Sequence, residues 1–392
     1  MQNASPSNSP LPALLRTGLY LLLAAVLGMT AISAFHAVQD RAALRATEER
    51  LVAKHGLGQT VHKKLAAGYQ DKDGGLLADA PADPEKWLNP DTLVLAHYID
   101  ADLDVDQQIV AWKDLQTHLE QATGKTIVLE EYRNTADDVA AVKAGNVQLV
   151  ALHAADTPYV VNNAGFVPVA VFGSESGAHG NRLDIVVGEN SPIKSLADLR
   201  GRTLTCTAPD SITGYRAAIA ILAQDTGMRP DVDYSLNFSH GQKRSLLGLV
   251  EGKFEVAAVS DDKVQSMLKK GTLEPSQYHM IYQSEIIPRL TIGHVYNLAP
   301  DLADKVTAAI LSFTNENGAS EDDSPEPMRF FAVDYPHDFE FVRRIDDSFD
   351  PRFSKNVKPV VTLPVDPDAE SSPGAPAELP AEGVDAKGET SE

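Results

Sequence analysis

Short apolar segments alternate with helical segments from about residue 91 to residue 350, and this alternation limits the fold most strongly. "DTLVLAHYI" (91–99) predicts a strand, and "KTIVLEEY" (125–132) predicts the next one. The segment between them carries apolar residues at helical spacing: Ile109, Trp112, Leu115 and Leu119. Strands that alternate with helices of this length predict an α/β fold with a parallel sheet covered on both faces. About 270 residues of such units exceed one comfortable core, so we expect two α/β lobes.

The charge balance excludes one large class of partners. With 34 basic and 55 acidic residues, the formal net charge is -21 at pH 7. Nucleic-acid phosphates are bound by a surplus of Lys and Arg, so we expect no nucleic-acid partner. A small anion needs only a local set of donors and stays possible. Part of the acidic excess lies in residues 361–392, which are rich in Pro, Ala and Glu and are predicted to be disordered.

The N-terminal region contains an uncharged apolar run from Thr17 to Phe35, preceded by Arg16. A helix of that length can cross a bilayer, so residues 1–35 are interpreted as a cytoplasmic tip and a transmembrane anchor. The alternative is a signal peptide that is cut near Ser33 and Ala34. Either interpretation predicts export of the rest of the chain to the periplasm or outside the cell. Residues 36–90 are predicted to form a juxtamembrane helix and a linker.

Cys206 is the only cysteine of the chain. It cannot form an internal disulfide, so the domain must be stabilised by its core. Cys206 lies inside a predicted strand, where a buried and unreactive thiol is the usual case. The histidines lack metal-ligand spacing, and no nucleophile–base signature or phosphate loop is present. We therefore predict no enzyme activity, no metal and no cofactor.

The stretch "TLTCTAPDSITGYRAAIAILAQDTG" (203–227) predicts a strand, a turn rich in hydroxyl groups, and a helix. Two interpretations of Ser211, Thr213 and Gly214 are open. A Ser or Thr oxygen can cap the helix by accepting one of its free backbone N–H groups. Alternatively, those N–H groups, the hydroxyls and the helix dipole can hold an anion.

Four segments together resemble the periplasmic substrate-binding proteins of phosphate, phosphite and phosphonate ABC transporters (PhnD-like). They are "SPIKSLADLRGRTLTCTAPDSITGY" (191–215), "GLVEGKFEVAAVSDD" (248–262), "YQSEIIPRLTI" (282–292) and "APDLADKVTAAILSF" (299–313). The resemblance spans about residues 92 to 350. It implies a type II periplasmic-binding-protein fold whose two hinged lobes close on a ligand. The lobe boundaries are then 91–185 for the first lobe, 186–285 for the second, and 286–360 for the return to the first.

Carried over by position, the resemblance implies a set of ligand-binding residues. The oxyanion turn of the family falls on Ser211, Ile212, Thr213 and Gly214, with Ile212 replacing the usual threonine. The pocket histidine matches His240 in "NFSHG", and the acid after the next strand matches Asp261 or Asp262. Two tyrosines of the family map near Thr135 and Leu152, with His153 beside the latter. The expected ligand-binding set is therefore Ser211, Ile212, Thr213, Gly214, His240, Asp261, Asp262, Thr135, His153 and Tyr98.

The chemistry of these residue types agrees with a tetrahedral oxyanion. Ser211, Thr213 and the amides that follow can donate to its oxygens. His240 can donate to another oxygen, or it is simply a surface turn histidine. A carboxylate at Asp261 or Asp262 can accept from a P–OH group or pair with an aminoalkyl group, or it caps a helix. The implied partners are an ABC permease and its ATPase. The alternatives are an anchored receptor that signals to a partner, and a binder of another small organic anion.

Overall fold

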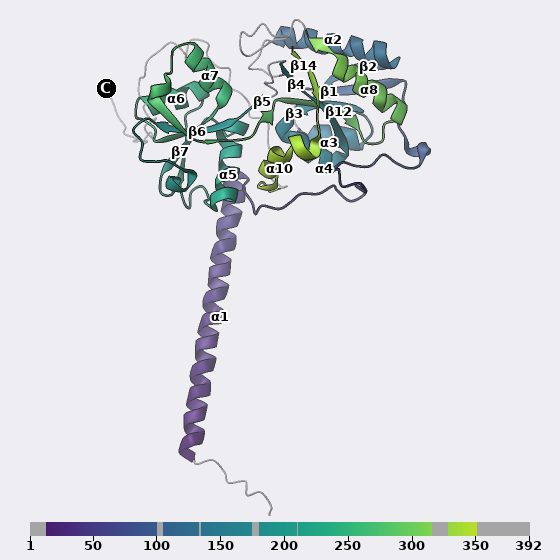
Figure 1. The fold of residues 1–392 in the computed structure, drawn as a ribbon. Helices are drawn as coiled ribbons and strands as arrows, with labels where there is room; N and C mark the ends of the chain where they lie inside the picture. The colour runs from purple at the N-terminus through teal and green to yellow at the C-terminus, as the bar shows by residue number, and fades with distance from the viewer. Residues whose placement is uncertain are drawn as a thin grey trace, which may run out of the picture. The chain divides into compact units, whose positions relative to one another are not determined.

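The structure is a computed structural model that describes residues 13–99, 105–132, 135–174, 180–209, 211–315 and 328–350. Within these ranges, the side chains of residues 13–20, 23–25, 31, 135, 136 and 315 also lie outside the description. The acidic segment that we predicted to be disordered lies beyond the described residues. The described chain forms an α/β fold around two main sheets (Figure 1).

The seven-stranded sheet has the strand order β13-β14-β4-β12-β3-β1-β2. Its strands are β1 (Thr92–His97), β2 (Thr126–Glu131), β3 (Leu149–His153), β4 (Phe166–Ser174), β12 (Leu290–Val295), β13 (Thr314–Asn315) and β14 (Met328–Ala332). Strands β1, β2 and β3 are parallel, as expected, whereas β12, β4 and β14 pair antiparallel with their neighbours. The prediction of a purely parallel sheet is therefore wrong. Strand β12 starts with Leu290 opposite His153, the last residue of β3, so it must run in the opposite direction.

The helices of this part of the chain are α2 (Val105–Thr123), α3 (Thr135–Lys143), α4 (Thr157–Ala164), α8 (Pro300–Ser312), α9 (Tyr335–Asp338) and α10 (Glu340–Asp347). In α2, the predicted apolar stripe is only partly buried. Trp112, Leu115 and Leu119 lie in the core, whereas Ile109 is 40% exposed. The buried face of α2 begins only at Trp112 because α8 and β2 cover the later turns of the helix.

The five-stranded sheet has the order β10-β6-β9-β7-β8. Its strands are β6 (Leu183–Gly188), β7 (Thr203–Cys206), β8 (Ser235–Phe238), β9 (Val256–Ser260) and β10 (Tyr278–Gln283). Alternate residues of β9 are buried on opposite faces, with Ala257 and Val259 packed in the cluster formed with α6 (Gln242–Val250) and α7 (Asp261–Lys269). Val256 and Ala258 belong to the core that also contains α5 (Ala217–Thr226). Cys206 is fully buried in β7, and burial raises the pKa of its thiol.

Two short strands pair where the chain passes between the sheets. Strands β5 (Gly180–Asn181) and β11 (Ile287–Pro288) are antiparallel to each other. Next to them, Leu183 N donates to Ser284 Oγ at 2.8 Å, and Arg182 Nη1 donates to the Ser284 carbonyl at 2.7 Å. The two crossing segments are therefore hydrogen-bonded to each other over several residues.

Helix α1 (Ala13–His55) is continuous over 43 residues and includes the apolar run and the predicted juxtamembrane helix. The side chains of residues 17–20, 23–25 and 31 lie outside the description, and over the described residues alone no helix is both long enough and apolar enough to cross a membrane. The predicted linker after α1 packs against the core, because Gly58 N donates to the Ser348 carbonyl and Ala66 N donates to the Asn162 carbonyl. Further along, Ala299 N donates to the Leu88 carbonyl at 2.8 Å.

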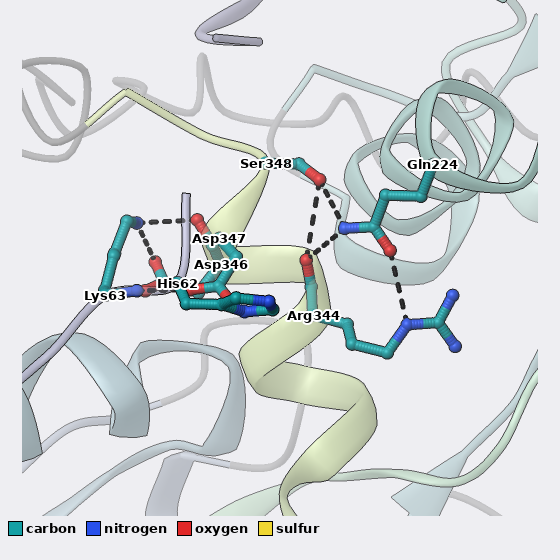
Figure 2. Close-up of polar contacts among 7 residues, drawn as sticks. All are labelled: His62, Lys63, Gln224, Arg344, Asp346, Asp347 and Ser348. Carbon is teal, nitrogen blue, oxygen red and sulfur yellow. Dashed lines mark hydrogen bonds and ion pairs between the residues drawn. The ribbon is translucent and has the colours of Figure 1, made fainter. Parts of the chain in front are cut away.

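Helix α10 contacts both the segment after α1 and helix α5 (Figure 2). Lys63 Nζ lies 2.7 Å from Asp346 Oδ1, and burial raises the pKa of Asp346 despite this cation. On the other side, Gln224 of α5 donates to the Arg344 carbonyl at 2.5 Å and to Ser348 Oγ at 2.6 Å. The sequence "FEFVRRIDD" thus forms a helix that joins segments far apart along the chain.

Candidate functional site

The turn after β7 has the cap geometry that the sequence allowed. Ser211 Oγ accepts a hydrogen bond from Gly214 N at 3.0 Å. Residues Ile212–Arg216 then form one π-helical turn that leads directly into α5. Single π-helical turns occur frequently at functional sites. The side chains of Ser211, Ile212 and Thr213 are half-buried.

Gly214 is required by the packing of this turn. A Cβ atom added at Gly214 would lie 2.1 Å from Thr207 Oγ1 and 2.9 Å from Ser211 Oγ. Thr207 also holds the neighbouring backbone, because its N–H donates to the Gly214 carbonyl at 3.1 Å and its carbonyl accepts from His240 N at 2.8 Å. The residue after β7 therefore connects the turn to the loop that carries His240, a role that the sequence analysis missed.

The candidate residues that follow β7, β8 and β9 gather at one edge of the five-stranded sheet. Strands β7, β8 and β9 are parallel, so the turn, His240 and Asp261 all follow the carboxyl ends of neighbouring strands. Gln242 Oε1 also accepts a hydrogen bond from Ser260 N at 3.0 Å, which links the loop after β8 to the end of β9. His240 is exposed and has a positive φ of 58°. In open α/β sheets, ligands bind outside the carboxyl ends of the strands.

The two carboxylates already have partners. Asp261 Oδ1 accepts from Arg182 N and from Asp262 N, both at 2.8 Å. Asp262 accepts from the Ser260 hydroxyl, and its Oδ2 lies 3.4 Å from Arg289 Nη2. Asp261 thus connects the start of α7 to the start of β6. Asp262 connects the start of α7 to Arg289, which directly follows β11.

The other candidates lie at the carboxyl edge of the seven-stranded sheet. The rings of Tyr98, after β1, and His153, at the end of β3, have centroids 3.9 Å apart and are tilted by 31°. Tyr98 is half-buried and His153 is exposed. Leu152, the second position to which a family tyrosine maps, is buried in the core. The side chain of Thr135 lies outside the described residues, although its backbone begins α3.

Arg289 lies between these groups and was not singled out from the sequence. Its guanidinium donates to Asn181 Oδ1 at 2.8 and 3.1 Å and reaches Asp262, and its carbonyl accepts from Ala154 N, next to His153. The sequence feature that could have identified Arg289 is its position directly after "IIP" (286–288), where the chain crosses back to the first sheet. A planar guanidinium fork is suited to an oxyanion.

Acidic groups accompany the aromatic pair on the seven-stranded sheet. Burial, together with the nearby charges of Asp156 and Asp137, raises the pKa of Asp138 to about 7. Asp138 lies in the first turn of α3, which follows β2. No cluster of three metal-ligating side chains occurs among the residues that the structure describes.

Comparison with known proteins identifies the family. The family model described as "ABC transporter, phosphonate, periplasmic substrate-binding protein" matches residues 99–329. The chain belongs to this family. It is therefore the substrate-binding component of an ABC importer rather than an enzyme, and its globular part is extracytoplasmic.

One curated relative agrees with this assignment, and solved structures show a similar fold. This binding protein is 26% identical over 245 residues to the phosphate-import protein PhnD of Mycolicibacterium smegmatis, covering 59% of the present chain and 75% of the relative. The XAC2383 protein of Xanthomonas citri, solved bound to ATP, aligns at 14% identity and a TM-score of 0.50 over 69% of this chain and all of that one. PhnD1 of Prochlorococcus marinus, in complex with methylphosphonate, aligns at 13% identity and a TM-score of 0.42, covering 66% of this chain and all of that one. The likeness to XAC2383 concerns the fold alone.

Proposed function

We propose that the protein captures a phosphorus oxyanion (phosphate, phosphite or a phosphonate) on the turn Ser211–Gly214. The observation that carries this proposal is the convergence of the turn and His240 at one sheet edge, tied together through Thr207. Backbone N–H groups at a helix start and adjacent hydroxyls are suited to a tetrahedral anion. The family description and the phosphate-import relative support the same ligand class.

The residues of the seven-stranded sheet are proposed to approach the ligand from the opposite side. The hydrogen-bonded segments β5 and β11 then act as a hinge, and Arg289, Tyr98 and His153 complete the site when two lobes close. Closure would shift the population toward the form that the permease recognises. Because Asp262 is paired with Arg289, we assign Asp262 an indirect role in orienting that guanidinium. Asp261 and Thr135 remain candidates for direct contact with a P–OH or amino group.

Isothermal titration calorimetry on the purified full chain tests the proposal. Phosphate, phosphite, methylphosphonate and aminoethylphosphonate are titrated in turn, with sulfate as the control. We expect binding of at least one phosphorus oxyanion and weaker binding of sulfate, which has no proton to donate to a carboxylate near neutral pH. Sulfate binding as tight as that of every phosphorus oxyanion, or no binding of any of them, would contradict the proposal.

We also propose that Thr17–Phe35 anchors the protein in a membrane. The support is the uncharged apolar sequence of this run and the exposure of Leu21, Leu22 and Leu27 on α1. An anchored chain should resist extraction by alkaline carbonate and be released by detergent. The reason is that an apolar helix, once inserted in a bilayer, does not leave it without detergent. Release by carbonate, or a mature N-terminus near Phe35, would exclude the anchor.

A further inference from the structure

The end of helix α1 is hydrogen-bonded to the turn that we propose as the anion site. His55, the last residue of α1, is only 3% exposed. Its Nδ1 lies 2.7 Å from the hydroxyl of Tyr215, and its Nε2 lies 2.7 Å from Asp231 Oδ2. Lys54 Nζ contacts the same carboxylate oxygen at 2.6 Å. A residue from outside both sheets thus contacts the π-helical turn directly.

Tyr215 adjoins the turn that is proposed to bind the anion. It follows Gly214 immediately, is 4% exposed, and packs its ring edge-on against Phe238 at 5.2 Å between centroids. Phe238 ends β8 and precedes Ser239 and His240. The Tyr215 ring is therefore held between the two segments that carry the anion donors. A shift of this ring would move the Ser211–Gly214 turn and the His240 loop relative to each other.

The hydrogen bonds around His55 define its orientation. The Asp231 carboxylate accepts from Nε2–H, which leaves Nδ1 to accept from the Tyr215 hydroxyl in the neutral ring. Burial raises the pKa of Tyr215, so the phenol keeps the proton that it donates. Burial raises the pKa of Asp231, whereas its hydrogen bonds with Lys54 and His55 lower it. The net effect lowers the pKa, so the carboxylate stays an acceptor.

A second contact fixes the other end of the same turn. The guanidinium of Arg216, the last residue of the π-helical turn, lies 4.7 Å from the centre of the Phe349 ring. Phe349 in turn forms an isolated β-bridge with Leu57, two residues after His55. The turn is thus attached to the segment around residues 55–57 both through Tyr215 and through Arg216.

We propose that His55 is a positioning residue for the anion turn and couples anion affinity to the docking of helix α1. The inference rests on the proposed function, because it assumes that residues 211–214 bind the anion. Binding sites of this kind depend on donors held to within a fraction of an ångström. By reciprocity, an anion that prefers the positioned turn also strengthens the docking of α1, so the helix end reports ligand occupancy.

The test uses the full chain in detergent and the phosphorus oxyanion that the unchanged protein binds best in calorimetry. Tyr215→Phe removes only the hydroxyl and keeps the ring packed on Phe238, and His55→Ala removes the acceptor. We expect each variant to raise Kd about tenfold, as for one lost hydrogen bond of about 1.4 kcal/mol, and the double variant to raise it no further. His55→Gln, which restores a donor and an acceptor, should recover part of the affinity.

Two controls separate positioning from general stability. Lys54→Ala removes a partner of Asp231 without touching Tyr215, so its Kd should stay within about twofold of the unchanged protein. Hydrogen exchange of the amides of residues 49–55 should slow on anion binding in the unchanged protein and in Lys54→Ala, but not in Tyr215→Phe.

The outcomes distinguish the two claims. If the unchanged chain binds no phosphorus oxyanion, the proposed function fails and the inference fails with it. If the unchanged chain binds but folded Tyr215→Phe and His55→Ala have normal Kd values, the inference alone is overturned. Additive effects of the two substitutions, or equal loss in Lys54→Ala, would also overturn it.

Discussion

At the carboxyl edge of the five-stranded sheet, backbone N–H groups and hydroxyls surround Gly214, and the carboxylates of Asp261 and Asp262 already have partners. At the same edge of the seven-stranded sheet, the polar atoms come from the stacked rings of Tyr98 and His153 and from carboxylates that include Asp138. The first edge has no space for an additional atom at Gly214, and each edge carries one exposed histidine, His240 at the first and His153 at the second. At the first edge, tight packing around Gly214 fixes the backbone donors, whereas at the second edge the polar atoms belong to larger side chains.

This difference suggests that the two edges recognise different parts of the ligand. Fixed backbone donors suit the part that all phosphorus oxyanions share, the tetrahedral group itself. Rings and carboxylates suit the part that differs among ligands, such as an organic or amino substituent. Substitutions at each edge, and different ligands, test whether the two edges have these separate roles.

Replacement of Gly214 by Val should abolish detectable anion binding. The added Cβ would lie 2.1 Å from Thr207 Oγ1, so the turn cannot close around its donors. Calorimetry measures the loss, and circular dichroism checks the fold. Gly188→Ala is the matched control, because a Cβ there would lie 3.9 Å from the nearest atom, the Leu249 carbonyl oxygen. Normal affinity in Gly214→Val would show that the turn is not the binding site.

Replacement of both Ser211 and Thr213 by Ala should weaken anion binding by about two to four orders of magnitude. Each charge-assisted hydrogen bond contributes about 1.5–3 kcal/mol, and about 1.4 kcal/mol corresponds to a tenfold change. Loss of the Ser211 cap should also cost about 0.5–2 kcal/mol of unfolding free energy.

A cap elsewhere in the chain provides the control for this pair. Ser195 stands at the start of the short helix Leu196–Leu199 and bonds to the Asp198 carboxylate. Ser195→Ala should lower stability slightly and leave Kd unchanged. If the Ser211 and Thr213 substitutions behave in the same way, the turn is a cap and not an anion site.

Replacement of Asp138 by Asn should flatten the pH dependence of stability between about pH 4 and pH 7. The folded-state pKa is raised to about 7, so folding favours the protonated acid. Stability is therefore highest below the unfolded-state pKa and falls as the pH rises through the folded-state value. At about 1.4 kcal/mol per pKa unit, the loss removed by Asn is at most about 4 kcal/mol.

Urea unfolding at several pH values measures this effect. Asp301→Asn, at an exposed position of α8, is the control for the removal of one carboxylate. An unchanged profile in Asp138→Asn would mean that the carboxylate is well solvated, in conflict with its burial.

Replacement of Tyr98 or His153 by Ala should have the smallest effect on phosphate. An aromatic pair contributes about 0.5–1.5 kcal/mol, which corresponds to roughly a two- to tenfold change in Kd. A larger effect on aminoethylphosphonate than on phosphate would support the division between the two edges. Equal losses for both ligands would contradict it, and Tyr98→Phe, which keeps the ring, is the control.

The α/β class, the family and the main candidate turn could be predicted from the order of the residues alone. Periodicity identified strands β1 and β2 and the buried residues Trp112, Leu115 and Leu119 of α2, because burial on one face leaves a repeating apolar pattern. Hydroxyls and a glycine before a helix indicated the turn, because both the cap and an anion site need those residue types at that place.

Contacts between segments far apart in the sequence could not be predicted and became visible in the folded chain. The antiparallel course of β12 depends on where the chain re-enters the sheet, and no local pattern contains that information. Arg289 and Asp262 are close because two crossing segments meet, although either residue alone looks like a surface charge. His55 and Tyr215 are 160 residues apart in the sequence and are hydrogen-bonded because two distant segments meet. Local propensity is a property of neighbouring residues, whereas these pairings follow from how the packed elements bring separate segments together.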